Sequence, residues 1–208
     1  LYADLKEQIL MYDSTYIFKE NEKIQLINDY IFISFLIGND FLPHLPSYNL
    51  RSDGLFLLLE KYISIYVNFG TSLIDNTIKK INNQVLSALL RKISENEDNL
   101  LVKYNTKRKK FRFRTFKDTE YQRQLDLLNN KPSIERIGED YIDIGNTSNN
   151  WKSKYYDKCL NINDSEDLDG CILNYLTGLK WTYEYYFIGC SNYTWKYNYR
   201  HSPSAIDI

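Results

Sequence analysis

Apolar residues recur at helical spacing through most of this chain, and no other feature constrains its fold as strongly. Residues three or four positions apart share one face of a helix, whereas a strand turns every second residue toward the core. The spacing therefore predicts a mainly α fold. We expect helices over residues 1–10, 24–38, 52–70, 78–93, 119–128 and 164–187.

Residues 96–150 interrupt this regular pattern. Charged and aromatic residues alternate over 96–118, and 129–150 contains Asn-, Gly- and Pro-containing runs that are typical of loops. Because 208 residues amount to little more than one domain of roughly 150, we predict a single helical module over 1–208 with a divergent basic and loop segment at about 96–150. The chain begins with Leu and has no secretory signal pattern, so we expect a fragment of a larger protein.

Charge and composition exclude several classes of protein. The 26 Lys and Arg residues nearly balance the 27 Asp and Glu residues, which excludes a uniformly basic nucleic-acid coat. The most hydrophobic stretch, residues 30–38, is far shorter than the roughly 18 residues of a membrane-spanning helix. Three widely spaced cysteines and two histidines do not form a zinc pattern. We expect an intracellular protein, nuclear or cytoplasmic, with no membrane partner.

The most informative stretch is residues 37–46, which read IGNDFLPHLP. Gly38 and Asn39 suit a left-handed helix C-cap, and the two prolines that follow prevent the helix from continuing. Asp40 is therefore predicted to lie on a rigid turn beyond an apolar helix. Hard divalent cations such as Mg²⁺ prefer oxygen ligands that are held in place. An Asp after a helix is also a common cap or turn residue, so spacing alone leaves both roles open.

Residues 38–46 resemble the GNDFLPHLP motif that follows an apolar helix in the XRN family of 5'-3' exoribonucleases. A second block at 175–190 and a weaker one at 151–156 are similar to the same family, in the same order. The likeness lapses in the middle of the chain. Departures from the family pattern, which indicate a distant member, stand at Thr177, Tyr193, Asn198 and Arg200.

The resemblance implies a processive nuclease that hydrolyses phosphodiester bonds of single-stranded RNA bearing a 5' monophosphate, with Mg²⁺ or with Mn²⁺ in its place. Asp40 is similar to the last acidic residue of the family's metal site, which implies a catalytic, metal-binding role. The other carboxylates of that site belong to an upstream α/β nuclease core, of the PIN or flap-nuclease type, that is absent from this chain. We therefore expect this helical module to pack against that upstream half, and to be inactive alone.

Two residues near Asp40 have open roles. Asn39 is a candidate hydrogen-bond partner of the metal site, or a residue that ends the helix. His44 is a candidate substrate-side neighbour of Asp40, or a polar residue whose bonds are made within the turn. Neither choice is decided by the pattern.

Residues 103–117 carry eight positive charges and no negative charge. The Phe-Arg-Phe-Arg alternation over 111–114 has the two-residue period of a strand with one aromatic and one cationic side. Such a run suits an RNA-backbone surface, a nuclear-import-like cluster or a solvated connection. The candidate nucleic-acid contacts are Lys107, Arg108, Lys109, Lys110, Arg112 and Arg114.

Aromatic residues near the C-terminal end have two interpretations, base stacking or core packing. Trp181 and Tyr185 lie one helical turn apart, which favours core packing. Trp195 and Tyr197 remain open, and we retain Trp195 as a candidate nucleic-acid contact.

Two other functions remain as alternatives. The first is a non-catalytic helical module, derived from such a nuclease, that binds RNA or protein. The second is a flap-endonuclease-like DNA nuclease. It is disfavoured because the chain continues into Pro-His-Leu-Pro and lacks the glycine-rich motif that grips duplex DNA in those enzymes.

Overall fold

The computed structural model describes residues 1–50, 53–109, 119–130 and 151–208, with the backbone alone at 104–109 and 126–130. In order along the described chain, its helices are α1 (Tyr2–Tyr12), α2 (Glu22–Ser34), α3 (Gly54–Phe69), α4 (Asn83–Ser94), α5 (Glu97–Lys109), α6 (Glu120–Asn130), α7 (Trp151–Tyr155) and α8 (Ser165–Phe187). A 3-10 turn, η1 (Phe35–Ile37), extends α2, and a π-helical turn, η4 (Tyr156–Leu160), extends α7. The prediction of a mainly α fold is confirmed.

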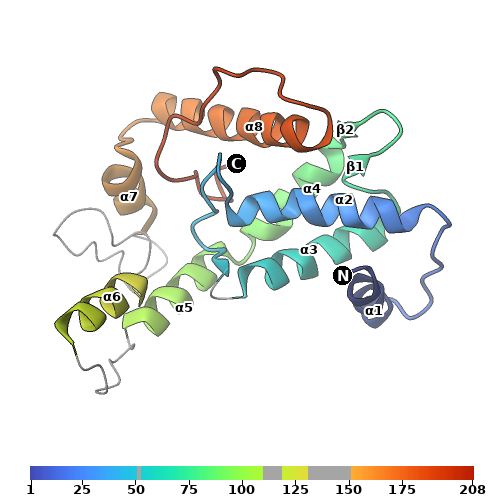
Figure 1. Cartoon of the computed structure of the whole chain (residues 1–208), viewed down its shortest axis with the longest axis horizontal. Helices are drawn as coiled ribbons and strands as arrows, with labels where there is room; N and C mark the ends of the chain where they lie inside the picture. Colours follow the sequence, from blue (N-terminus) through green and yellow to red (C-terminus); the bar gives the residue numbers. More distant parts are fainter. Residues whose placement is uncertain (51–52, 110–118, 131–150) are drawn as a thin grey trace.

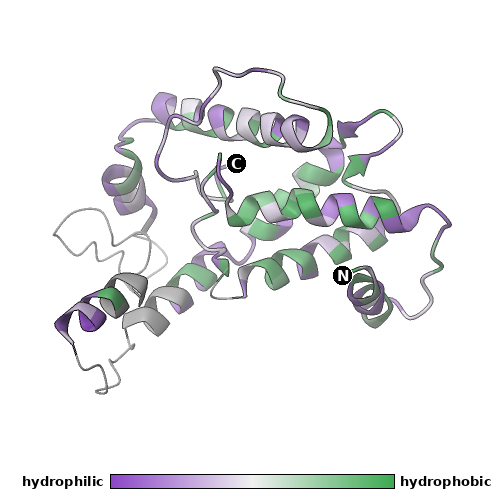
Figure 2. Ribbon diagram, viewed as in Figure 1, coloured by the Kyte–Doolittle hydropathy of each residue, from purple (hydrophilic) through white to green (hydrophobic). Residues whose placement is uncertain are grey.

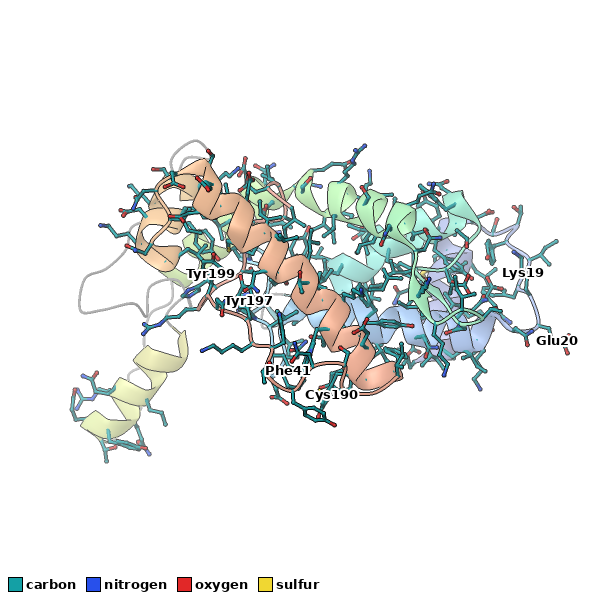
Figure 3. All side chains as sticks on the ribbon, turned by 90° about the horizontal axis from the view of Figure 1, so that it is seen from above. Lys19, Glu20, Phe41, Cys190, Tyr197 and Tyr199 are labelled. Carbon is teal, nitrogen blue, oxygen red and sulfur yellow. The ribbon has the colours of Figure 1, made fainter. Side chains whose placement is uncertain are left out.

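Helices α2 and α3 lie side by side at the centre, with α4 behind them and α8 above them (Figure 1). Seen from above, α8 runs diagonally over the central helices (Figure 3). Hydrophobic residues predominate along α2 and α3 (Figure 2). Burial of this apolar surface is the main force that holds the helices together. Fully buried members of the core include Ile9 of α1, Leu26 and Phe32 of α2, Leu58 and Tyr62 of α3, Leu89 of α4 and Tyr175 of α8.

A second, smaller apolar cluster joins α7 and η4 to the first part of α8. Trp151, Tyr155 and Cys171 are fully buried in it, and Leu101 of α5 contributes from below the central helices. The indole Nε1 of Trp151 donates to the Asp98 carboxylate of α5 at 2.6 Å. This cluster connects the divergent middle of the chain to the helix that covers the candidate site.

The helix predicted over residues 78–93 begins later than expected. Residues 74–81 instead form a hairpin of two short antiparallel strands, β1 (Ile74–Asp75) and β2 (Lys80–Ile81). The Asp75 carboxylate accepts hydrogen bonds from two backbone amides within the hairpin, and the Asn82 carboxamide caps α4. These side-chain bonds to the backbone compete with helix formation.

Part of the segment at 96–150 is helical, contrary to its irregular pattern. Helix α5 begins with Glu97 and Asp98 and ends in basic residues, an order that suits the helix dipole. The helix expected over 119–128 is confirmed as α6. The strand expected over 111–114 lies outside the described residues.

Helix α8 begins and ends close to where the sequence places it. The Asp164 side chain accepts a hydrogen bond from the Asp167 backbone N–H at 2.8 Å, and so caps the helix. All three cysteines are free thiols. None of the helices in the described ranges is long and apolar enough to cross a membrane.

Candidate functional site

The candidate site is the turn that follows α2 and η1, where Gly38 reverses the chain. Gly38 has φ of +97°, a conformation that favours glycine. A Cβ at this position would lie 3.0 Å from the backbone nitrogen of His44. Glycine therefore lets the chain fold back closely. The predicted helix end at Gly38 is confirmed, but ψ of 151° places Gly38 outside the left-handed helical region that was expected for the cap.

The Asn39 side chain closes the turn around Asp40. Its Oδ1 atom accepts hydrogen bonds from the backbone N–H groups of Phe41 at 2.8 Å and Leu42 at 2.9 Å. The Asn39 backbone N–H also donates to the Leu42 carbonyl at 2.9 Å. Asp40 thus lies at the tip of a doubly closed turn, as the prediction of a rigid turn requires.

The Asp40 side chain is exposed to solvent. Within the part of the chain that the structure describes, its carboxylate takes part in no hydrogen bond or salt bridge. An exposed carboxylate on a fixed turn has the oxygen ligands that a hard divalent cation prefers. The described residues contain no group of three His, Cys, Asp or Glu side chains that could hold a metal ion. The turn therefore offers a metal ion one carboxylate ligand, that of Asp40.

Aromatic residues of α8 hold the residue that follows Asp40. The ring of Phe41 lies 4.9 Å from the rings of both Trp181 and Tyr185, between ring centroids. In Figure 3 the Phe41 side chain lies beside the C-terminal half of α8. Trp195 stacks on Trp181 at 5.1 Å. The turn is therefore packed against a helix that is remote from it in the sequence.

The aromatic predictions have mixed outcomes. Trp181 is 8% exposed and its Nε1 donates to the Asn192 carbonyl at 2.9 Å, so its predicted core role is confirmed. Tyr185 is 43% exposed, so its core assignment is wrong. Tyr185 lies at the rim of the aromatic cluster, where its ring stacks on Trp181 and contacts Phe41, and part of the residue meets solvent. Trp195 is partly buried, and its nucleic-acid role stays a prediction.

His44 lies on the far side of the turn, against the C-terminal segment. Its Nδ1 atom is 2.7 Å from the Leu45 carbonyl oxygen, and its own carbonyl accepts a hydrogen bond from the Ser202 hydroxyl at 2.8 Å. Burial lowers the pKa of the neighbouring His201, and the charge of His44 acts in the same direction. The structure thus gives His44 a place in the packing of the turn, and its substrate-side role stays a prediction.

The end of the motif is joined to the C-terminal segment by Glu97. Its buried carboxylate accepts hydrogen bonds from the Ser47 hydroxyl at 2.8 Å and from the backbone N–H groups of Ala205 and Ile206 at 3.0 and 2.9 Å. Burial raises the pKa of Glu97, against the effect of these three donors. This link fixes the motif at the opposite end from Asp40.

Sequence reasoning missed Glu97 and two further buried carboxylates, Glu22 and Asp29. Glu22 accepts hydrogen bonds from the hydroxyls of Tyr16 and Tyr66. The Asp29 carboxylate accepts from the Tyr62 hydroxyl and from two backbone N–H groups of residues 73 and 74. The sequence did contain a signal for Asp29, because a charged residue on the apolar face of α2 indicates a buried carboxylate. It contained no such signal for Glu97.

The basic candidates fall largely outside the described residues. The backbone of Lys107, Arg108 and Lys109 forms the last turn of α5, and their side chains are outside the description. Lys110, Arg112 and Arg114 lie wholly outside it. Their contact with nucleic acid stays a prediction.

Comparison with known proteins gives one matching family model and several relatives. The model described as the Xrn1 helical domain matches residues 20–143 and 128–208. The 5'-3' exoribonuclease 2 homolog of Drosophila melanogaster is 22% identical over 223 residues, covering 88% of this chain and 24% of that protein. The 5'-3' exoribonuclease 1 of Schizosaccharomyces pombe is 23% identical, covering 94% of this chain and 22% of that protein. The 5'-3' exoribonuclease 1 of Homo sapiens is 25% identical, covering 88% of this chain and 13% of that protein. The chain spans about a quarter or less of the length of these relatives.

Proposed function

Because this chain belongs to the XRN family of 5'-3' exoribonucleases and carries its helical domain, we propose that it forms the helical part of such an enzyme. The substrate is single-stranded RNA with a 5' monophosphate, and the reaction is hydrolysis of its phosphodiester bonds inside the cell, in the nucleus or the cytoplasm. The observation that carries the proposal is the exposed Asp40 carboxylate on a turn fixed by Asn39.

Asp40 acts in this proposal as one ligand of the catalytic metal. Mg²⁺ or Mn²⁺, when bound, supplies activation of water and stabilisation of the leaving oxygen. The Asp40 carboxylate contributes negative charge at a fixed place, and the Asn39 bonds to the backbone N–H groups of Phe41 and Leu42 keep that place constant. The remaining carboxylates come from the upstream nuclease half, so this chain alone is inactive.

The RNA side of the proposal rests on charge and aromatic character. Residues 107–114 supply the basic run, whose contacts with phosphates would make RNA binding weaken as salt increases. Trp195 is a partly buried residue, and its exposed part is available for contact with a base. The exposed fraction of Tyr185, beside Phe41, supports the same use.

A non-catalytic module that binds RNA or protein is the second candidate. It is favoured because the described residues contain no group of three His, Cys, Asp or Glu side chains that could hold a metal ion. The two candidates differ in their response to the upstream half, because only the nuclease gains metal-dependent activity from it.

The test uses the protein that carries this chain together with its upstream half. We expect magnesium-dependent degradation of RNA with a 5' monophosphate and little degradation of the same RNA with a 5' hydroxyl. Degradation of neither RNA by the folded protein would favour the non-catalytic module. Preferential cleavage of flapped DNA would instead favour the flap-endonuclease alternative.

A further inference from the structure

One face of α8 is turned toward the loop that carries Asp40. We name it the α8 contact face. Leu42 lies against Gly178 of this face. The ring of Phe41 lies against the rings of Trp181 and Tyr185. Positions spaced i, i+3, i+4 and i+7 share one side of a helix. The residues of the α8 contact face at this spacing are Gly178, Trp181, Thr182 and Tyr185.

The absence of a side chain at Gly178 sets the distance between α8 and the turn. A Cβ at this position would lie 2.6 Å from Leu42 Cδ2 and 2.7 Å from Trp195 Cη2, and both distances are too short for real contacts. Leu42 is 2% exposed, so its side chain has little free space in which to rotate. Its backbone N–H is also one of the two that Asn39 binds. A methyl group at Gly178 therefore presses on the closed turn itself.

In the described residues, the turn and α8 each carry one buried polar side-chain atom without a hydrogen-bond partner. Among the described residues, the buried side-chain N and O atoms that lack a hydrogen bond are Asn39 Nδ2 and Thr182 Oγ1. Thr182 is 0% exposed and lies in the middle of the α8 contact face, between residues that touch the turn. Asn39 belongs to that turn. Buried polar groups in native proteins are nearly always hydrogen-bonded, directly or through a water.

We propose that the α8 contact face positions Asp40 for metal binding, with Gly178 and Thr182 as positioning residues. Gly178 allows the turn to approach the helix. The Thr182 hydroxyl and the Asn39 carboxamide, which have no direct partner among the described residues, are joined in this proposal by a hydrogen-bonded water. This inference rests on the proposed role of Asp40, and it adds a remote helix to the parts that determine metal affinity.

The test compares Gly178→Ala with Gly170→Ala in the complete protein. Both glycines lie in α8, and both changes increase helix propensity by about 1 kcal/mol. A Cβ at Gly170 would meet only the Tyr199 hydroxyl at 3.7 Å, which is ordinary contact. The measurements are amide hydrogen exchange of the peptide spanning residues 39–44 without metal, the Mg²⁺ concentration for half-maximal RNA cleavage, and the unfolding temperature.

We expect Gly178→Ala to speed exchange in the turn and to raise the Mg²⁺ requirement, with cleavage at low Mg²⁺ reduced between about 10- and 100-fold. Gly170→Ala should behave as wild type in both measurements. Equal behaviour of the two variants would overturn the inference. If Asp40→Asn abolishes cleavage while Gly178→Ala does not alter it, only the positioning role fails. If Asp40→Asn is fully active, the proposed function fails as well.

Thr182→Val provides a second test that does not depend on the folding of Gly178→Ala. The change removes the hydroxyl and keeps the shape, and Thr182→Ser keeps the hydroxyl as the control. We expect faster exchange in the turn for Thr182→Val and near wild-type exchange for Thr182→Ser. A Thr182→Val protein with unchanged exchange and a higher unfolding temperature would show that the hydroxyl is unpaired, and would overturn its role.

Discussion

Asp29, in the middle of α2, and Asp40, on the turn after it, are both carboxylates of one helix-and-turn unit, yet their surroundings are opposite. Asp29 is 0% exposed and accepts hydrogen bonds from the Tyr62 hydroxyl at 2.5 Å and from the backbone N–H groups of Leu73 and Ile74 at 2.7 Å. Asp40 is exposed, and within the described chain it accepts none.

The difference separates a carboxylate that stabilises the fold from one that is free to bind. A buried carboxylate must have its oxygen atoms satisfied inside the protein, because burial without donors is costly. Asp29 meets this need by joining α2, α3 and the β1 region. In the turn around Asp40, the Asn39 side chain accepts hydrogen bonds from the backbone N–H groups of Phe41 and Leu42, and the Asp40 carboxylate is left exposed.

The largest effect should follow Asp40→Asn, because it removes the ligand charge with little change of shape. We expect RNA cleavage by the complete protein to fall at least about 100-fold, beyond the loss typical of outer partners of a metal site. The free energy of unfolding should change by no more than about 0.5 kcal/mol, as for other exposed positions. Steady-state cleavage and denaturant unfolding measure the two quantities.

Asp53→Asn is the matched control for this change. Asp53 is also exposed, and its left-handed backbone conformation tolerates Asn. We expect near wild-type cleavage. A comparable loss of cleavage in both variants would indicate a general effect of surface charge and would contradict a specific role of Asp40.

Asp29→Asn should have the reverse pattern, with a loss of stability and little direct effect on cleavage. Asparagine would replace one acceptor oxygen with an NH2 donor that faces a backbone N–H donor, which should lower the free energy of unfolding by about 1–3 kcal/mol. Urea unfolding measures this loss. An unchanged stability would contradict the structural role of Asp29.

Glu97→Gln should have a smaller effect of the same kind, of about 1–2 kcal/mol. In Glu97, Oε1 accepts from the Ser47 hydroxyl and the Ala205 N–H, and Oε2 accepts from the Ile206 N–H. Glutamine keeps an acceptor oxygen at only one of these two places. We expect faster amide exchange over residues 205–207. Exchange equal to wild type would show that this link does not hold the C-terminal segment.

The smallest expected effect is a change in the pH dependence of stability that comes from Asp29. Burial raises the pKa of Asp29 from 3.8 to about 6, against its three hydrogen bonds. Between these values the folded state binds more proton than the unfolded state, so stability falls as pH rises, by at most about 1.4 kcal/mol per pH unit for one group. The stability gap between wild type and Asp29→Asn should therefore narrow from pH 4 to pH 7. A stability gap that widens over this pH range would contradict the raised pKa of Asp29.

Local signals in the sequence were sufficient for several elements. Apolar spacing predicts helices over 52–70 and 164–187, and Gly38 predicts a helix end; the structure confirms these ends to within two residues. The rigid turn around Asp40 follows from the same local signals. By contrast, the hairpin at 74–81 depends on side-chain bonds from Asp75 and Asn82, which apolar spacing does not detect.

The remaining parts of the site depend on partners that are distant in sequence. Donors to Asp29 come from residues 62, 73 and 74, and those to Glu97 come from residues 47, 205 and 206. The contact between Leu42 and Gly178 is likewise formed only in the folded chain. Periodicity and capping report on neighbours within a few residues, so these contacts could not be predicted from them.

Metal binding by the complete protein is the most direct test of the role of Asp40. Calorimetric titration of Mg²⁺ into the wild type and into Asp40→Asn measures affinity without RNA and without turnover. The account predicts binding to the wild type and an affinity at least about tenfold lower for the variant, with Asp53→Asn equal to wild type. Equal affinity of Asp40→Asn and the wild type would contradict the assignment of Asp40 as a metal ligand.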